Sequence, residues 1–389
     1  MGDIMHTTMY QAIVVGAGPA GSIAAAILSS HGCRVLLLDR VEFPRDKVCG
    51  DGVIPGAIKL LSQMGLELEM DQFHWCDRVR VISPRGYAFE GSLAEYNSCA
   101  YIIPRKTLDH TLYEFALQQG AEFERLRVIE PIVEQGVVCG VRGKLGSDVV
   151  ERRADITIAA DGANSVITRS LRQGKAADRH YAVSMRAYFD GVHGSERRAD
   201  FYVNPSALPG YGWIFPLGEG RANVGVILRL DTLRRSRRTL RQEFDRFIAD
   251  PRAADRLSRA EPIGKIRGWP LPLASQPLQR AYAGALLIGD AGAFISPLSG
   301  GGIYNGLVSG KLAAEVALEA LRKNDYSLKE LGKFEAQWRR ALGRGLRREL
   351  ILQRVLSWPG LVDLALRLVG RNERIARLVV NLLAWIWKG

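Results

Sequence analysis

The sequence lacks the patterns that mark metal-binding and disulfide-rich proteins. It has no Cys-x-x-Cys pair and no two histidines at metal-ligand spacing, and its five cysteines are scattered: Cys33, Cys49, Cys76, Cys99 and Cys139. Zinc sites and disulfide scaffolds need clustered cysteines, so we expect neither a metal nor a disulfide framework. The six histidines form no recognisable group, and we assign them no catalytic role. These absences suit a protein of the reducing cytoplasm.

Low-complexity tracts are also missing, and the first nine residues contain no apolar segment of the kind found in secretory signals. We therefore expect no secretory signal peptide. With 47% hydrophobic residues, the composition is that of an ordered globular protein. A chain of 389 residues exceeds what one small core usually serves, which predicts two structural lobes.

Positive charge is in excess, with a net charge of +12, and it is unevenly placed. Residues 333–389 carry 12 Lys or Arg against 4 Asp or Glu. One interpretation is a solvated arginine-rich helical face. The other is that residues 375–389, an apolar run containing Trp385 and Trp387, form an interfacial helix on the inner face of an anionic membrane. This run is shorter than the ~20 apolar residues that span a bilayer. Nucleic acid is not favoured, because no binding motif accompanies the charge.

The N-terminal pattern predicts a β-α-β unit. Residues 10–15 and 34–38 are short apolar runs typical of buried strands, and residues 19–30 between them have a helical pattern. Further strands are predicted within 78–104, up to residue 160, and within 181–230. Helices are predicted for 106–119, for the charged segment 232–259, and for most of the chain after 303, with a break at Pro359-Gly360.

These segments predict an α/β protein (α+β overall) with a Rossmann-like cofactor domain, an inserted antiparallel β-sheet domain and a helical C-terminal tail. We assign residues 1–75, 105–180 and 276–325 to the discontinuous cofactor domain. Residues 76–104 and 181–275 are assigned to the β-rich substrate domain. Residues 326–389 form the helical C-terminal region. We make no prediction of the oligomeric state.

A glycine-rich motif, Gly16-x-Gly18-x-x-Gly21, lies directly after the first predicted strand and opens the first helix. The first glycine permits a tight turn, the second lets backbone approach a pyrophosphate, and the third allows close helix–strand packing. Asp39 ends the next strand, at the distance expected for a carboxylate that binds a ribose 2′-OH. This acidic residue argues against NADP and leaves FAD or NAD. We assign the following residues to this cofactor half: Gly16, Gly18, Pro19, Ala20, Gly21, Asp39 and Arg40.

A second glycine-rich turn lies far downstream, between the apolar run 285–288 and a helix beginning near residue 303. Gly289-Asp290 within it resembles the "GD" motif of flavoproteins, whose Asp contacts the ribityl or ribose part of FAD. Pro297 and Gly300, Gly301 and Gly302 would then border the pyrimidine end of the flavin, where backbone N–H groups favour the negative charge of its reduced form.

Two further features favour FAD over NAD. Asp161-Gly162 follows a predicted strand and resembles the "DG" motif of flavin hydroxylases and reductases. Arg105, before the helix 106–119, is placed to reach a phosphate or ribose oxygen, unless it is simply an exposed surface arginine.

With these motifs placed, the chain resembles the p-hydroxybenzoate hydroxylase-like superfamily and, within it, the geranylgeranyl reductase family. The resemblance covers roughly residues 10–320, and three segments carry it: 43–52 (FPRDKVCGDG), 211–216 (YGWIFP) and 289–305 (GDAGAFISPLSGGGIYN). Related flavin halogenases usually have Trp-x-Trp-x-Ile-Pro where this chain has Tyr211-Gly-Trp213-Ile-Phe215-Pro216. That departure argues against halogenation.

Tyr211, Trp213 and Phe215 alternate in a predicted strand, so their side chains share one face. They form either an aromatic stripe in the core or the wall of an apolar cavity for a polyprenyl chain. In the second case Tyr211 and Trp213 would also be catalytic, because aromatic faces stabilise a developing cation. The resemblance places Cys49 near the flavin, where Lys47 would favour its thiolate. The alternative is a buried, inert cysteine.

The resemblance implies an FAD-dependent reductase that saturates double bonds in a geranylgeranyl or polyprenyl chain of a lipid, chlorophyll precursor or menaquinone-type quinone. The first alternative is an FAD-dependent aromatic monooxygenase, because the same scaffold supports both reactions. An FAD-bound interaction protein is a third. No second Gly-x-Gly-x-x-Gly is present. The reductant is therefore NAD(P)H that binds transiently or a ferredoxin-type protein.

Overall fold

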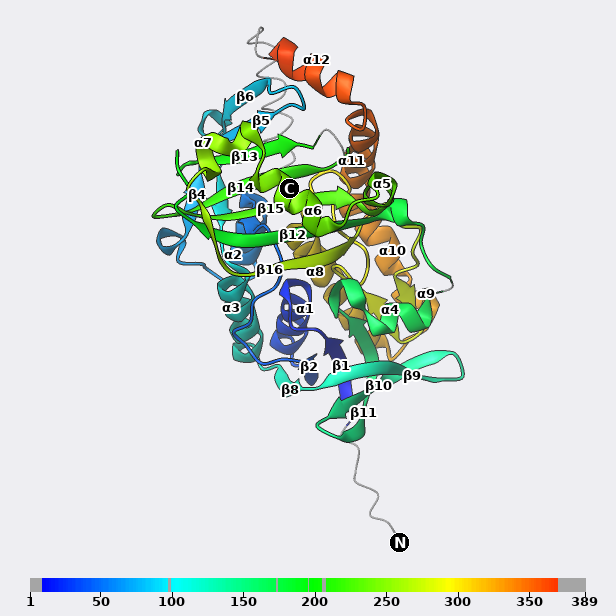
Figure 1. Ribbon diagram of the computed structural model, residues 1–389. Helices are drawn as coiled ribbons and strands as arrows, with labels where there is room; N and C mark the ends of the chain where they lie inside the picture. The colour runs from blue at the N-terminus through cyan, green and yellow to red at the C-terminus, as the bar shows by residue number, and fades with distance from the viewer. Residues whose placement is uncertain (1–8, 97–98, 173, 195, 205–207, 370–389) are drawn as a thin grey trace.

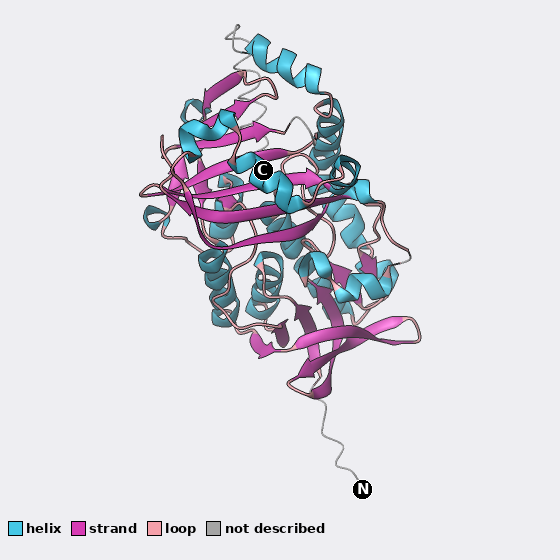
Figure 2. Cartoon of the chain, viewed as in Figure 1, coloured by secondary structure: helices cyan, strands magenta, loops and turns pink. Residues whose placement is uncertain are grey.

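The computed structural model describes residues 9–96, 99–172, 174–194, 196–204 and 208–369, which are built around two large sheets with helices packed on them (Figure 1, Figure 2). The predicted fold class is confirmed. A Rossmann-like sheet, a mainly antiparallel sheet and a set of C-terminal helices make up the described chain. The predicted interfacial helix at 375–389 lies outside the described residues.

The first sheet has the strand order β17-β18-β11-β1-β2-β8, and the ribbon β9–β10 extends from β11. Strands β18, β11, β1, β2 and β8 run parallel to one another. Its central strands are apolar and buried on both faces, as expected for a parallel sheet covered by helices. The strands are β1 (Tyr10–Val15), β2 (Val35–Asp39), β8 (Glu122–Arg125), β9 (Arg127–Glu134), β10 (Val137–Leu145), β11 (Asp148–Ala159), β17 (Ala281–Tyr282) and β18 (Ala285–Leu287).

One face of this sheet packs against α1 (Pro19–Ser30), α3 (Arg105–Gln118) and α8 (Ile303–Lys323) in a single hydrophobic core. Small residues let α1 and α8 approach closely. A Cβ atom added at Gly310 would lie 2.4 Å from the carbonyl oxygen of Ala20. This close packing brings the N-terminal ends of two helices, one from each glycine-rich turn, to the same place.

The second sheet has the order β16-β12-β15-β14-β13-β5-β6 and is antiparallel except for the β13–β5 pair. A small sheet, β3-β7-β4, lies beside it. The strands are β3 (Gly52–Val53), β4 (His74–Cys76), β5 (Arg78–Ile82), β6 (Ala88–Ser92), β7 (Ala100–Ile102), β12 (Tyr181–Asp190), β13 (Arg198–Val203), β14 (Tyr211–Gly218), β15 (Arg221–Arg229) and β16 (Glu261–Pro272). The predicted domain assignments agree with which strands join which sheet, and their boundaries stay predictions.

The single helix predicted over 232–259 is wrong. The segment forms three short helices: α5 (Leu230–Ser236), α6 (Leu240–Ile248) and α7 (Ala254–Leu257). Arg237 has a left-handed backbone (φ 55°) that ends α5, and Thr239 begins α6 with a capping box. Local capping thus divides a charged stretch whose composition alone favours a continuous helix. Two further short helices are α2 (Pro55–Gln63) and α4 (Val166–Leu171).

The C-terminal helices are α9 (Leu328–Leu331), α10 (Lys333–Trp338), α11 (Arg344–Val355) and α12 (Pro359–Val369), with a π-helical segment at Arg339–Gly343. Pro359, where we predicted a break, is the first residue of α12, a position that tolerates proline because that N–H has no helical partner. Helix α12 packs against β6 of the second sheet (Figure 1). Among the described residues, no helix has the length and apolar character needed to cross a bilayer.

Candidate active site

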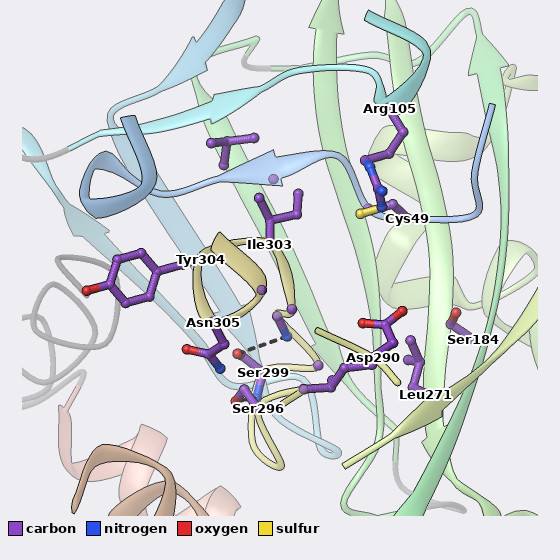
Figure 3. Close-up of a pocket in the computed structure, with 18 of the residues that line it drawn as sticks. Cys49, Arg105, Ser184, Leu271, Asp290, Ser296, Ser299, Ile303, Tyr304 and Asn305 are labelled. Carbon is purple, nitrogen blue, oxygen red and sulfur yellow. Dashed lines mark hydrogen bonds between the residues drawn. The ribbon is translucent and has the colours of Figure 1, made fainter. Parts of the chain in front are cut away.

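A cavity lies where the two sheets, the glycine-rich turns and helix α11 meet (Figure 3). One side is formed by the N-terminal ends of α1 and α8, and the other by strand β14 of the second sheet. The predicted site residues that line it are Gly18, Pro19, Ala20, Cys49, Arg105, Gly162, Tyr211, Trp213, Phe215, Gly289, Asp290, Gly300, Gly301 and Gly302. Segments almost 300 positions apart in the sequence therefore share one site.

Two helix N-termini face this cavity without a partner for their positive ends. Gly18 is the N-cap of α1 and Gly302 the N-cap of α8, and neither helix has a side-chain cap or an acidic residue in its first turn. Free N–H groups and the helix dipole both favour an anion at such an end. The cavity is therefore built to receive negatively charged groups at two points.

The first glycine-rich turn is held mainly by backbone packing. A Cβ atom at Gly16 (φ +105°) would lie 2.3 Å from the Ala160 carbonyl oxygen, and one at Gly21 would lie 1.8 Å from the Gly16 carbonyl oxygen. These two glycines do not line the cavity, whereas Gly18 does, with no atom closer than 3.8 Å to its would-be Cβ. The three glycines thus have the separate steric roles that we predicted.

Asp39 is tied to this turn. Its Oδ2 accepts a hydrogen bond from the Ala17 N–H at 3.0 Å and lies 3.7 Å from the Arg45 guanidinium. The carboxylate therefore orients the glycine-rich turn. Arg40 is exposed and is not part of the cavity wall. Ribose binding by Asp39 and a cofactor contact by Arg40 stay predictions.

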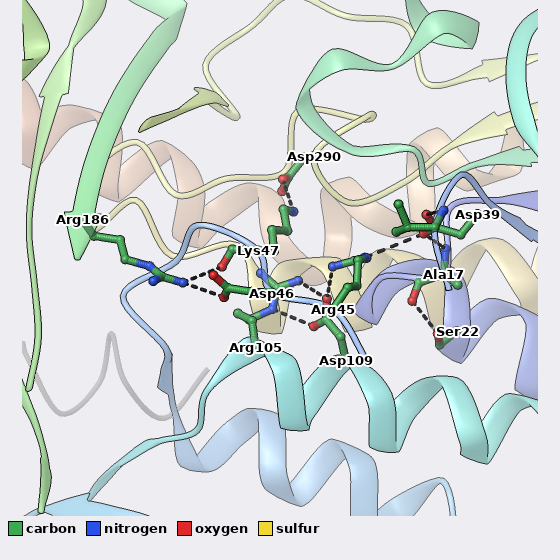
Figure 4. A network of polar contacts seen from close by, with 11 residues as sticks. Ala17, Ser22, Asp39, Arg45, Asp46, Lys47, Arg105, Asp109, Arg186 and Asp290 are labelled. Carbon is green, nitrogen blue, oxygen red and sulfur yellow. Dashed lines mark hydrogen bonds and ion pairs between the residues drawn. The ribbon is translucent and has the colours of Figure 1, made fainter. Parts of the chain in front are cut away.

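A chain of ion pairs fastens residues 45–47 to three different elements (Figure 4). Arg45 binds Asp109 of α3 at 2.9 Å, Asp46 binds Arg186 of β12 at 2.6 Å, and Lys47 binds Asp290 at 2.9 Å. This segment thereby bridges the two sheets and the second glycine-rich turn. It delivers the next residues, Val48 and Cys49, into the cavity.

Arg105 is not a surface arginine. It is the first residue of α3, is 4% exposed, and makes two hydrogen bonds to Asp109, from Nε at 2.6 Å and from Nη2 at 2.8 Å. Burial opposes its charge, but the adjacent Asp109 carboxylate holds the pKa of Arg105 above its ordinary value. A permanent buried cation therefore faces the cavity, next to the sulfur of Cys49 (Figure 3).

The expectation that Lys47 favours a Cys49 thiolate is wrong. The Lys47 ammonium is paired with Asp290, and burial raises the pKa of the Cys49 thiol although Arg105 acts in the opposite direction. Cys49 therefore carries its proton at neutral pH. The proton is held beside a guanidinium that would stabilise the charge left behind if it were transferred.

The second glycine-rich turn depends on side chains from remote elements. Ser309 of α8 accepts the Gly289 N–H, the Tyr211 hydroxyl donates to the Ser299 carbonyl at 2.6 Å, and Gln353 donates to the Pro297 carbonyl. Pro297 is buried beneath the turn, so its predicted place at the cavity is not observed. The wall is formed by Gly300, Gly301 and Gly302 instead.

Asp161 likewise does not line the cavity, although Gly162 does. Its Oδ2 accepts the N–H of Val166 at the start of α4, at 2.8 Å, and burial raises its pKa. The structure thus gives Asp161 a part in shaping the turn around Gly162. Direct cofactor contact by Asp161 remains a prediction.

Tyr211, Trp213 and Phe215 all line the cavity from β14, which supports the interpretation of this stripe as a cavity wall. Phe201 of β13 packs against Tyr211 and Phe215 with ring centroids 5.5 and 5.2 Å away, and it lines the cavity too. A Cβ atom at Gly50 would lie 3.1 Å from the Phe215 ring, so the Cys49 loop rests directly on this aromatic surface.

Sequence reasoning missed a buried polar cluster behind that surface. Asp51 is fully buried, and its Oδ2 accepts hydrogen bonds from the Tyr188 hydroxyl at 2.7 Å and from Asn223 Nδ2 at 2.8 Å. Asn223 also donates to the Cys49 carbonyl at 2.8 Å and accepts from Trp213 Nε1 at 3.0 Å. One amide therefore links the Cys49 loop to the aromatic wall.

Two features of Asp51 mark it as a strained and tuned residue. Its backbone is left-handed (φ 62°), a conformation that non-glycine residues rarely adopt. Burial raises the pKa of its carboxyl to about 6, against the hydrogen bonds from Tyr188 and Asn223 and the nearby Arg186. Such outliers gather at functional sites. The available signal was Asp51 itself, in the middle of a segment already singled out around Cys49.

Glu349 of α11 is a second residue that the sequence did not reveal. It lines the cavity, and its Oε2 accepts the Ser296 hydroxyl at 2.5 Å. Burial raises the pKa of this carboxyl. Ser296 in turn accepts the N–H groups of Leu298 and Ser299, at 3.2 and 3.0 Å. The C-terminal helices, which no motif connected to the site, thereby close the second glycine-rich turn.

Comparison with known proteins agrees with this geometry. A family model described as an FAD binding domain matches residues 9–313. The chain is 33% identical to digeranylgeranylglycerophospholipid reductase 2 of Methanopyrus kandleri, covering 95% of this chain and 92% of the relative. It is 32% identical to a menaquinone reductase of Mycolicibacterium smegmatis, covering 79% and 76%.

Among solved structures, a geranylgeranyl bacteriochlorophyll reductase-like protein from Thermoplasma acidophilum is similar, with a TM-score of 0.82 and 27% identity over 92% of this chain and 91% of the other. A flavin-dependent brominase has a TM-score of 0.73 at 20% identity, with 93% of both chains covered. At that identity the likeness shows a shared fold alone.

Proposed function

The chain belongs to the geranylgeranyl reductase-like family of FAD-dependent oxidoreductases, and from that premise we propose that it saturates carbon–carbon double bonds in the isoprenoid chain of a lipid or quinone. One observation carries the proposal. The aromatic wall of β14 and the protonated Cys49 thiol face the same cavity as the two glycine-rich turns.

The residues present fit FAD. Two uncapped helix N-termini and the buried cation Arg105 border the cavity, and Gly18 has open space where a Cβ would otherwise stand. We assign the α1 end and Asp39 to the ADP half, and Asp290 with Gly300–Gly302 to the flavin half. Bound FAD in its reduced form supplies the hydride for the reaction.

The cavity wall suits a long apolar chain. Trp213, Phe215 and Phe201 are joined there by Ile227, Trp269 and Leu271, so one flank is almost entirely hydrocarbon. An isoprenoid chain gains free energy by leaving water for such a surface, and it has no polar groups that need partners. An aromatic substrate for hydroxylation would fit the same wall. The size of the apolar flank, shared by β13, β14, β15 and β16, favours the longer molecule.

Reduction of an isolated trisubstituted alkene needs a proton as well as a hydride. We assign the proton to the Cys49 thiol, which burial keeps protonated and whose thiolate Arg105 would stabilise after transfer. The faces of Trp213 and Phe215 would stabilise the tertiary cation formed on the substrate. Tyr211 has a different task, because its hydroxyl is already bonded to Ser299: it holds the second turn in place.

The test is anaerobic turnover of the FAD-loaded protein with dithionite and a geranylgeranyl lipid or menaquinone. We expect a product that has gained two hydrogen atoms per reduced bond, measured by mass spectrometry. Repeating the reaction with NAD(P)H or a ferredoxin identifies the physiological type of donor. A product that has instead gained oxygen, formed only in air, would identify a monooxygenase and overturn the proposal.

A further inference from the structure

The C-terminal helices carry a group of exposed apolar side chains that neither the cavity nor the core uses. We call it the α11–α12 apolar surface, and its exposed fractions are large: Ile351 60%, Val355 47%, Trp358 68%, Leu361 44%, Leu364 52% and Leu368 45%. The other exposed large apolar residues of the described chain are distributed over distant segments. Isolated cases are ordinary, but a contiguous group signals an interaction surface.

Helix α12 is apolar on two opposite faces. Val362, Leu366 and Val369 pack with Phe89 of β6, at positions four and three residues apart. Leu361, Leu364 and Leu368 have the same helical spacing on the face that points away from that core. A helix that is apolar all round is normally covered on all sides. Within the described residues, the outward face has no cover.

Exposed arginines accompany these apolar residues. Arg344, Arg347 and Arg354 on α11 and Arg367 on α12 are all exposed. The two acidic residues of these helices are turned elsewhere: Glu349 binds Ser296 at the cavity, and Asp363 binds the backbone N–H and the guanidinium of Arg85. The surface therefore combines apolar side chains and positive charge, without an exposed carboxylate from either helix.

We propose that the α11–α12 apolar surface binds an anionic lipid bilayer. Leucines and Trp358 would enter the interfacial region, where tryptophan is favoured, while the arginines would meet lipid phosphates. A symmetric contact between two copies of the chain would instead bring these arginines face to face. Charge complementarity therefore selects anionic lipid over self-association.

The opposite side of α11 gives this docking a consequence. Glu349 and Gln353 contact the turn at 296–299 from the side of the helix that faces the cavity, so one helix separates the proposed bilayer surface from the cavity. On the proposed function, a membrane-embedded isoprenoid would have a short path to the site. The docking itself does not depend on the reaction and can be tested without any isoprenoid.

The experiment is cosedimentation of the full FAD-loaded chain with vesicles of phosphatidylcholine alone or with phosphatidylglycerol. We expect binding to the anionic vesicles, weakened about tenfold or more by combining Trp358→Ser, Leu361→Ser and Leu364→Ser, since interfacial affinity follows buried apolar area. Arg347→Gln with Arg354→Gln should weaken it several-fold and reduce its salt dependence. The matched control combines Leu145→Ser and Val149→Ser, two residues equally exposed on the β10–β11 hairpin.

A second measurement uses Trp358→Phe, which keeps an apolar ring and is expected to keep vesicle binding. Quenching of tryptophan fluorescence by brominated lipid should fall in this variant. Unchanged binding in the apolar triple variant would overturn the proposal and assign membrane contact to another segment. A dimer in sedimentation velocity that the same triple variant dissociates would overturn it in favour of self-association.

Discussion

The two glycine-rich turns border one cavity but are stabilised in opposite ways. The turn at 16–21 is held by its own backbone and one adjacent strand, with Gly16, Gly21 and Ala160 in direct contact. The turn at 289–302 is held by side chains from β14, α8 and α11, through Tyr211, Ser309 and Glu349. The first turn is a local structure, whereas the second is a product of the whole fold.

This difference explains how the cofactor and substrate halves of the site can be adjusted separately. A turn specified by steric fit tolerates little change but needs no help from distant elements. A turn tied to β14 and α11 senses what happens at the aromatic wall and at the C-terminal helices. Substitutions should therefore separate the two turns, and we order four of them by the size of the expected effect.

The largest effect is expected for Gly21→Ala. Its Cβ would lie 1.8 Å from the Gly16 carbonyl oxygen, which only a backbone shift can relieve, so we expect a loss of about 4 kcal/mol in unfolding free energy. Gly18→Ala is the matched control, with no atom within 3.8 Å, and should weaken FAD binding with little loss of stability. Urea unfolding and FAD titration measure the two effects. Equal stability losses would contradict a purely steric division of roles.

The next effect concerns Asp51, whose carboxyl pKa is raised from 3.8 to about 6. Because the folded state binds this proton more tightly, the resulting stability is complete below about pH 4 and is lost as the pH rises through 6. Relative to Asp51→Asn, the wild-type chain should therefore lose about 3 kcal/mol of unfolding free energy between pH 4 and 7. Urea unfolding across this range measures it. A difference that does not vary with pH would show that burial does not tune this group.

Cys49→Ala tests the proton assignment. We expect about a hundredfold slower turnover, typical for loss of a general acid, with unchanged FAD affinity because the first turn is independent of this loop. Cys76→Ala is the control, since Cys76 is buried outside the cavity. Anaerobic single-turnover kinetics provide the rate. If Cys49→Ala turns over at the wild-type rate, the thiol is not the proton source.

The smallest effect is expected for Tyr211→Phe, which removes one hydrogen bond to the second turn, worth about 1 kcal/mol. We expect FAD affinity to fall about fivefold while the ring still lines the cavity. Tyr87→Phe, at an exposed tyrosine, should change nothing. FAD titration decides between them, and unchanged affinity in Tyr211→Phe would mean that the second turn is also self-sufficient.

Much of the fold and cofactor site could be predicted because the information is local. The period-2 alternation of Tyr211, Trp213 and Phe215 and the spacing of Gly16, Gly18 and Gly21 follow from backbone geometry. The helix predicted over 232–259 failed for a local reason as well, since the Arg237 turn and Thr239 cap outweighed its composition.

What short-range pattern determined, then, is the β-α-β unit, the first glycine-rich turn and the face on which the aromatic residues stand. Only the tertiary structure decided that Arg105 is buried beside Asp109, that Cys49 keeps its proton, and that Asp51 is linked through Asn223 to Trp213. Ionisation and hydrogen-bond partners depend on desolvation and on groups far away in the sequence. No local pattern specifies those, and they exist only once both sheets and α11 have come together around the cavity.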